Sequence, residues 1–160
     1  LAQALEAHLS ALPLAQDPGA KAIGVKISGC PNSCGQHHIA DIGFYGSSRK
    51  VGEREVPHYV LLLGGRTREG EARFGQVVGR IPARRVPEAV ERILKRYLEE
   101  RQNGESFQAY LDRVGAASFK PLLQDLQEVP PYEEAPEFYQ DLGAEGEAFS
   151  VQLGRGECAV

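Results

Sequence analysis

The first half of the chain alternates apolar residues with polar or small ones in the manner of β-strands. Residues 22–28 follow a period of two, which predicts a half-buried strand. Residues 41–45 form a second candidate strand, and residues 58–63 form a third, whose continuous apolar run is typical of burial on both faces. Residues 74–81 predict a fourth strand that Pro82 ends. These segments together predict one β-sheet.

Helical periodicity marks the chain on either side of the predicted strands. Residues 1–12 carry a stripe of leucines at helical spacing, and Pro13 ends it. Residues 87–102 begin with a proline and gather their apolar side chains on one face, and a shorter helix over residues 107–114 ends at Gly115. Strands followed by helices favour the α+β class, here a two-layer structure in which helices pack on a mixed β-sheet.

The charge is distributed unevenly along the chain. The formal net charge is −4, but residues 49–101 hold 13 basic and 8 acidic residues, a net +5, and residues 124–160 hold 9 acidic residues and one arginine, a net −8. We interpret residues 1–127 as a single domain and residues 128–160 as an acidic, irregular tail. The asymmetry indicates either two solvated faces of opposite sign or a basic segment that faces an anion or an acidic protein.

Composition bears on the compartment and on the completeness of the chain. No apolar run is long enough to cross a bilayer, and residues 1–10 lack the features of a secretory signal. Three cysteines are too few for a disulfide scaffold and favour a reducing compartment. We therefore expect a cytoplasmic protein with neither a membrane nor nucleic acid as a partner. The absence of methionine leads us to expect a part of a longer protein.

The segment 28–46, SGCPNSCGQHHIADIGFYG, carries the candidate chemistry. Cys30 and Cys34 stand four positions apart directly after a predicted strand, so both sulfur atoms can reach one metal centre if a helix begins at Pro31. The glycines beside them remove side-chain bulk, as a large cofactor against the backbone requires. The spacing alone also fits two buried small residues, or a zinc site completed by one of the two histidines that follow.

The whole segment closely resembles the signature of the nitrite and sulfite reductases that contain sirohaem and a 4Fe-4S cluster. In that signature, a CPN core is followed by small residues and the second cysteine. The resemblance continues in order through residues 40–46 (ADIGFYG), 61–66 (LLLGGR), 86–94 (VPEAVERIL) and 104–111 (GESFQAYL). Four ordered matches are hard to explain by chance, and they extend over most of the predicted domain.

This resemblance implies a role for each residue of the motif. Cys30 and Cys34 would supply two of the four thiolates of the cluster, and Cys34 would also bridge to the sirohaem iron. Asn32 would lie against the sirohaem, with helix capping as the simpler interpretation. The family's other two cluster cysteines, and the Arg and Lys residues that bind its substrate, belong to upstream segments, and Cys158 lies in the tail. The resemblance thus implies catalytic residues upstream of Leu1 and a chain that is inactive alone.

The resemblance also implies a substrate and a partner. The string CPNSCGQ looks more like nitrite reductases, which implies six-electron reduction of nitrite to ammonia with ferredoxin as the electron donor. A sulfite reductase, which converts sulfite to sulfide, is the alternative within the family. A non-catalytic module that uses Cys30 and Cys34 to bind zinc, or for redox interaction, is the alternative of a different class.

Two further pairs of residues near the motif are weaker candidates. His37 and His38 could donate protons, although we interpret them as neighbours on a helix, one solvated and one packed. Arg66 and Arg68 could hold the carboxylates of sirohaem, or could be exposed loop residues.

Overall fold

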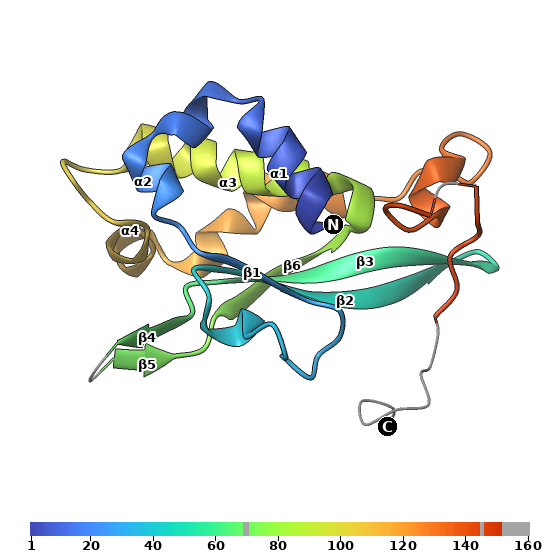
Figure 1. The fold of residues 1–160 in the computed structure, drawn as a ribbon, viewed down its shortest axis with the longest axis horizontal. Helices are drawn as coiled ribbons and strands as arrows, with labels where there is room; N and C mark the ends of the chain where they lie inside the picture. The colour runs from blue at the N-terminus through green and yellow to red at the C-terminus, as the bar shows by residue number, and fades with distance from the viewer. Residues whose placement is uncertain (69–70, 145, 152–160) are drawn as a thin grey trace.

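The computed structural model describes residues 1–68, 71–144 and 146–151. Its centre is a mixed four-stranded sheet in the order β1-β2-β3-β6 (Figure 1). The strands are β1 (Val25–Ser28), β2 (Ile42–Val51), β3 (Arg54–Leu63) and β6 (Gln76–Pro82). β1 runs parallel to β2, whereas β2 pairs with β3, and β3 with β6, in antiparallel fashion. All four predicted strands are therefore present in one sheet.

The α-helices lie on one face of this sheet (Figure 1). The α-helices are α1 (Ala2–Ser10), α2 (Pro18–Lys21), α3 (Val86–Glu100) and α4 (Phe107–Val114). The 3-10 helices are η1 (Pro13–Gln16), η2 (His37–Ile39), η3 (Ala83–Arg85), η4 (Ala116–Phe119), η5 (Pro121–Leu123), η6 (Asp125–Gln127) and η7 (Pro136–Tyr139). The predicted α+β class, with helices packed on a mixed sheet, is confirmed.

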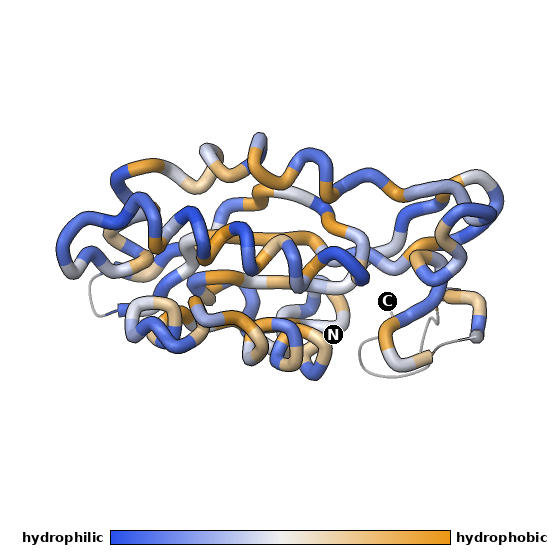
Figure 2. The backbone as a smooth tube through the Cα atoms, turned by 90° about the horizontal axis from the view of Figure 1, so that it is seen from above, coloured by the Kyte–Doolittle hydropathy of each residue, from blue (hydrophilic) through white to orange (hydrophobic). Residues whose placement is uncertain are grey.

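The hydrophobic core fills the space between the sheet and its helical layer. Ile42 and Phe44 of β2 face Leu63 and Leu61 of β3 in the register, and all four are at most 1% exposed. The buried residues of α3 are Val86, Ala89, Val90, Ile93, Leu94 and Tyr97. Hydrophobic residues accordingly gather in the middle of the molecule (Figure 2). Each fully buried side chain of this size stabilises the fold by about 1.5–3 kcal/mol.

The largest departure from the predicted elements is the β2–β3 hairpin. Each of its strands has ten residues and continues past the apolar segment into polar sequence. The strands are joined at Gly52, whose φ of +61° suits the tight turn. The polar half of the hairpin lacks the alternation that marks a half-buried strand, and the pattern of apolar residues therefore missed it.

A second, smaller hairpin projects beside the sheet (Figure 1). Its strands, β4 (Arg66–Arg68) and β5 (Glu71–Arg73), pair antiparallel. Arg66 and Arg73 both form ion pairs with Asp112 of α4, at 3.1 and 2.7 Å. These contacts tie the hairpin to the helical layer.

The chain after η6 packs against the turn end of the β2–β3 hairpin. Tyr139 of η7 is 4% exposed, donates its hydroxyl to the Pro130 carbonyl oxygen at 2.9 Å and packs edge-on against Tyr132. The guanidinium of Arg54 lies 3.8 Å from the centre of the Tyr132 ring. This cation–π contact joins the segment to the hairpin. No helix among the described residues combines the length and apolar character needed to cross a membrane.

Candidate functional site

The predicted site residues lie on a loop that crosses the face of the sheet opposite the helices (Figure 1). This cysteine loop, residues 29–40, leaves β1 after Ser28 and returns to the sheet at β2. Cys30 is partly buried, Cys34 is exposed, and both thiols are free. The structure therefore brings the two predicted ligands together on one short loop whose outer side faces solvent.

The predicted helix at Pro31 is wrong. The loop instead makes two turns and then the short helix η2. Ser33 and Gln36 adopt left-handed φ angles of 61° and 57°, which an α-helix does not accommodate. Asn32 therefore caps no helix; it is exposed and its side chain makes no hydrogen bond to any described residue.

Side chains from both ends of the loop hold the turn around Cys34. The Ser28 hydroxyl oxygen accepts a hydrogen bond from the Gly35 amide at 3.1 Å. The same oxygen is hydrogen-bonded to His37 Nδ1 at 2.8 Å. Ser33 Oγ is bonded to His38 Nδ1 at 3.0 Å, and Lys26 Nζ donates to Gln36 Oε1 at 2.7 Å. The turn is thus joined to β1 on one side and to η2 on the other.

Glycines in β2 and directly after β3 let the cysteine loop lie against the backbone. A Cβ atom on Gly43 would come within 3.0 Å of the His37 carbonyl oxygen, and one on Gly46 would do the same at Gly29. A Cβ on Gly65 would meet the carbonyl oxygen of His38. None of the three glycines has a positive φ, so close approach, and not backbone conformation, requires glycine at these positions.

The two histidines belong to a stack of rings. His37 lies 4.1 Å from His38 and 4.8 Å from Tyr45 between ring centres, and His38 lies 5.4 Å from Phe74. Both histidines lie on the short helix η2, where His37 is the packed member, with no exposed surface, and His38 is partly buried and not fully solvated. Burial, assisted by His38, lowers the pKa of His37, so its ring is neutral at pH 7.

Backbone amides of the loop are free to bind an anionic group. The amides of Cys30, Asn32 and Cys34 donate to no acceptor among the described residues. Amides grouped around a turn form concavities that suit anions, including iron–sulfur clusters. Two free cysteines with unpaired amides beside them match half of the four-cysteine donor set that a 4Fe-4S cluster needs.

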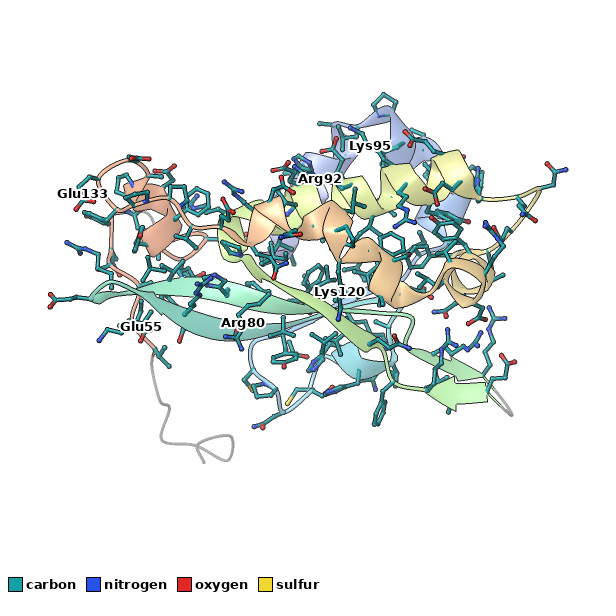
Figure 3. All side chains as sticks on the ribbon, turned by 180° about the vertical axis from the view of Figure 1, so that it is seen from behind. Glu55, Arg80, Arg92, Lys95, Lys120 and Glu133 are labelled. Atoms are coloured by element: carbon teal, nitrogen blue, oxygen red, sulfur yellow. The ribbon has the colours of Figure 1, made fainter. Side chains whose placement is uncertain are left out.

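A cleft of about 560 Å³ lies beside β6 and shares Tyr45 with the ring stack. Its charged lining residues are Arg80 and Lys120 (Figure 3). Neither cation pairs with a carboxylate within the described ranges. The cleft therefore presents positive charge that the described fold leaves unneutralised.

The remaining candidates have different surroundings. Arg66 is engaged with Asp112 and Glu71, whereas Arg68 is exposed and has no partner in the part of the chain that the structure describes. Cys158 lies outside the described residues. Among those that are described, no three His, Cys, Asp or Glu side chains are close enough together to hold a metal ion, so the zinc alternative finds no third ligand here.

Comparison with known proteins assigns this architecture. Residues 20–129 match the family model of the nitrite and sulphite reductase 4Fe-4S domain. The chain belongs to this family. Its cysteine loop and the sheet beneath it both fall inside the matched range, and the expectation drawn from the resemblance is confirmed at the level of the family.

Several relatives of this reductase domain are sulfite reductases. The chain is 33% identical over 95 residues to sulfite reductase (ferredoxin) 1 of Mycolicibacterium paratuberculosis, covering 58% of the chain and 17% of that protein. It is 32% identical over 111 residues to the sulfite reductase (NADPH) hemoprotein beta-component of Chromohalobacter salexigens, covering 69% and 17%. The solved structure of the Mycobacterium tuberculosis NirA protein aligns with a TM-score of 0.58 and 30% identity, over 70% of the chain and 20% of NirA. The chain thus spans less than a fifth of the length of these curated relatives.

Sequence reasoning missed the residues that support the loop. Ser28 and Lys26 were assigned only to a strand, and nothing in the strand pattern distinguishes a side chain that bonds a loop from one that does not. Gly43 did carry a signal, because a glycine inside a strand often marks close approach of another backbone.

Proposed function

We propose that this domain supplies half of the ligand set of a 4Fe-4S cluster coupled to sirohaem, in a reductase of nitrite or sulfite. The observation that carries the proposal is the pair Cys30 and Cys34, free thiols on one loop held against the sheet, within a chain of this family. The other two thiolates and the substrate-binding cations would come from upstream residues.

The residues of this chain have distinct roles in the proposal. Cys30 and Cys34 would hold cluster iron as thiolates, and Cys34 would also be the residue shared with the sirohaem. The free amides of the loop donate to the anionic cluster, while Asn32 contacts the sirohaem. When bound, the coupled centres pass electrons singly to an iron that holds the substrate.

The positive charge of the cleft beside β6 adds a candidate binding place for anionic groups to this proposal. Sirohaem carries several carboxylates, and the substrate is itself an anion. Arg80 and Lys120 are cations without carboxylate partners among the described residues, on a cleft that borders the ring stack. An arginine fork suits a carboxylate, and both residues lower the cost of gathering anionic groups there.

Nitrite and sulfite are both candidate substrates, each favoured by a separate observation. The string CPNSCGQ favours nitrite. The names of the relatives favour sulfite, since those of M. paratuberculosis and C. salexigens are both sulfite reductases. We retain nitrite reduction with ferredoxin as the donor as the working proposal, and the M. paratuberculosis relative, a sulfite reductase (ferredoxin), is compatible with that donor.

Metal and substrate assays on the full-length protein test the proposal. The purified protein should contain iron and acid-labile sulfide and should show the absorbance of sirohaem. The variants Cys30→Ala and Cys34→Ala should each lose cluster iron. Cys158→Ala is the matched control and should keep it. Zinc bound without iron would favour the non-catalytic module.

The choice of substrate needs a direct comparison. Values of kcat/KM for nitrite and sulfite, measured with reduced ferredoxin and with a reduced viologen dye, should favour nitrite. A preference for sulfite would leave the cofactor proposal in place and overturn the substrate. The isolated 160-residue chain should show neither sirohaem absorbance nor activity, because half of the site is elsewhere.

A further inference from the structure

We infer that Ser28 and His37 are positioning residues that fix Cys34 in place before the cluster binds, while Cys30 remains free to adjust. This inference rests on the proposed function, because it assigns unequal roles to the two thiolates of the same cluster. It concerns the hydrogen bonds of the loop and not the identity of its ligands.

The turn around Cys34 has an unfavourable backbone conformation that the chain must hold. Ser33 and Gln36 flank Cys34, and both have positive φ angles although neither is glycine. Residues of this kind leave the left-handed region readily unless surrounding contacts hold them there. The conformation of Cys34 therefore depends on those contacts.

Ser28 provides the contact nearest to Cys34. Its hydroxyl accepts from the amide of Gly35, the residue directly after Cys34, at 3.1 Å. Ser28 is 5% exposed and belongs to β1, whose backbone is fixed by pairing with β2. The hydrogen bond thus joins the peptide that follows Cys34 to the rigid sheet.

His37 holds the Ser28 hydroxyl in turn. Its Nδ1 atom lies 2.8 Å from Ser28 Oγ, and its ring is wholly buried against Tyr45. His37 Nε2 has no hydrogen-bond partner among the described residues, so the contact with Ser28 is the ring's one hydrogen bond within them. Because packing around the buried ring keeps it from rotating, the direction of its hydrogen bond to Ser28 is fixed.

The half of the loop around Cys30 has no comparable support. Within the described structure, no side chain forms a hydrogen bond to Cys30, Pro31 or Asn32. A Cβ on Gly29 would meet nothing within 4 Å, whereas one on Gly35 would overlap the backbone of β1. The loop after Cys34 is therefore held by side-chain hydrogen bonds, whereas before Cys30, among the described residues, only the backbone contact of Gly29 with Gly46 holds it.

This asymmetry suits the chemistry proposed for the two cysteines. A thiolate that joins a cluster to a second metal must satisfy two coordination geometries at once, which leaves it little tolerance for displacement. A thiolate that binds only the cluster can follow the cluster. The supported residue is Cys34, to which the bridging role is assigned.

The test compares variants that remove or keep the Ser28 hydroxyl in the full-length protein. Ser28→Ala removes it, Ser28→Thr keeps it in a strand-compatible side chain, and His37→Phe keeps a buried ring without Nδ1. Ser118→Ala is the matched control, since that hydroxyl bonds the Gly115 carbonyl oxygen away from the loop.

Two measurements follow the loop and the centre separately. Hydrogen exchange by mass spectrometry, on protein freed of iron, should show the segment around Gly35 exchanging about fivefold faster in Ser28→Ala and His37→Phe. In iron-loaded protein, the rate of iron release to a chelator should rise about fivefold in the same two variants, with a changed EPR signal of the reduced centre. Ser28→Thr and Ser118→Ala should match the unmodified protein.

The outcomes separate this inference from the proposed function. If the unmodified protein binds no iron, the proposed function fails, and the exchange experiment still tests the hydrogen bonds. If Ser28→Thr behaves like Ser28→Ala, or if neither Ser28→Ala nor His37→Phe changes exchange or iron release, the positioning role is refuted. Should Ser28→Ala fail to fold, His37→Phe decides alone.

Discussion

Substitution of Gly43 by alanine should test whether the cysteine loop is held by direct contact with the sheet. A Cβ at this position would come within 3.0 Å of the His37 carbonyl oxygen, and both groups belong to backbone that is fixed by pairing or packing. Such overpacking costs about 1–3 kcal/mol. The lower entropy of an unfolded chain with alanine offsets about 0.5–1 kcal/mol of this cost.

We therefore expect Gly43→Ala to lower the free energy of unfolding by about 1–2 kcal/mol. Urea unfolding followed by circular dichroism measures this as a midpoint lower by roughly 1 M, given a typical slope of about 1–3 kcal/mol per molar. The matched control is Gly79→Ala in β6, where the added Cβ would lie no closer than 3.5 Å to Gln127. The urea midpoint of Gly79→Ala should equal that of the unmodified protein or be slightly higher. Equal midpoints for the two variants would refute close packing of the loop.

Three further substitutions test other parts of the structure. Burial lowers the pKa of His58 below its usual 6.5, so on acidification the unfolded chain binds a proton at this residue before the folded chain does. The free energy of unfolding should therefore be highest above about pH 6.5 and fall toward pH 5. Urea unfolding at each pH should show a smaller fall in His58→Phe. Ser106→Ala removes the hydroxyl that caps α4 at the Ala109 amide and should cost about 0.5–2 kcal/mol in thermal unfolding, whereas Ser106→Asp should not. Tyr132→Leu removes the ring under Arg54, and exchange at the tip of the β2–β3 hairpin should accelerate while that of α3 stays unchanged; a uniform change would contradict a local role.

The apolar elements could be predicted because burial of apolar side chains dominates their formation. In β3, the run of leucines must be buried whatever the rest of the chain does, and Val60, Leu61 and Leu62 are indeed at most 4% exposed. The long amphipathic helix α3 also lies where its periodicity placed it, because its apolar face is continuous. The polar end of the β2–β3 hairpin depends on pairing alone, and no local apolar pattern reports it.

The loop that carries the candidate ligands could be located from the sequence, but its shape could not. Cys30 and Cys34 could be recognised from their spacing and their neighbours in the sequence. The turn around Cys34 could not, because Ser33 and Gln36 have left-handed conformations, and the hydrogen bonds of their side chains to His38 and Lys26 join parts of the fold that a local pattern does not report. Those contacts arise when β1 and η2 meet in the folded chain. A local rule that places a helix after a proline has no access to them.

The two faces of the sheet differ, since one carries the hydrophobic core and the other carries the candidate site. The helical face buries the large apolar side chains, and each contributes about 1.5–3 kcal/mol. The strain at Ser33 and Gln36 is of order 1–3 kcal/mol per residue and lies on the opposite face, where the glycine contacts join it to the same strands. A strained loop can therefore persist on a sheet whose other face is firmly packed. It follows that a cavity in the core, as in Ile93→Ala, should lower overall stability while leaving the local protection of the Gly35 amide from hydrogen exchange nearly unchanged. Ser28→Ala should instead reduce the protection of the Gly35 amide while leaving overall stability nearly unchanged.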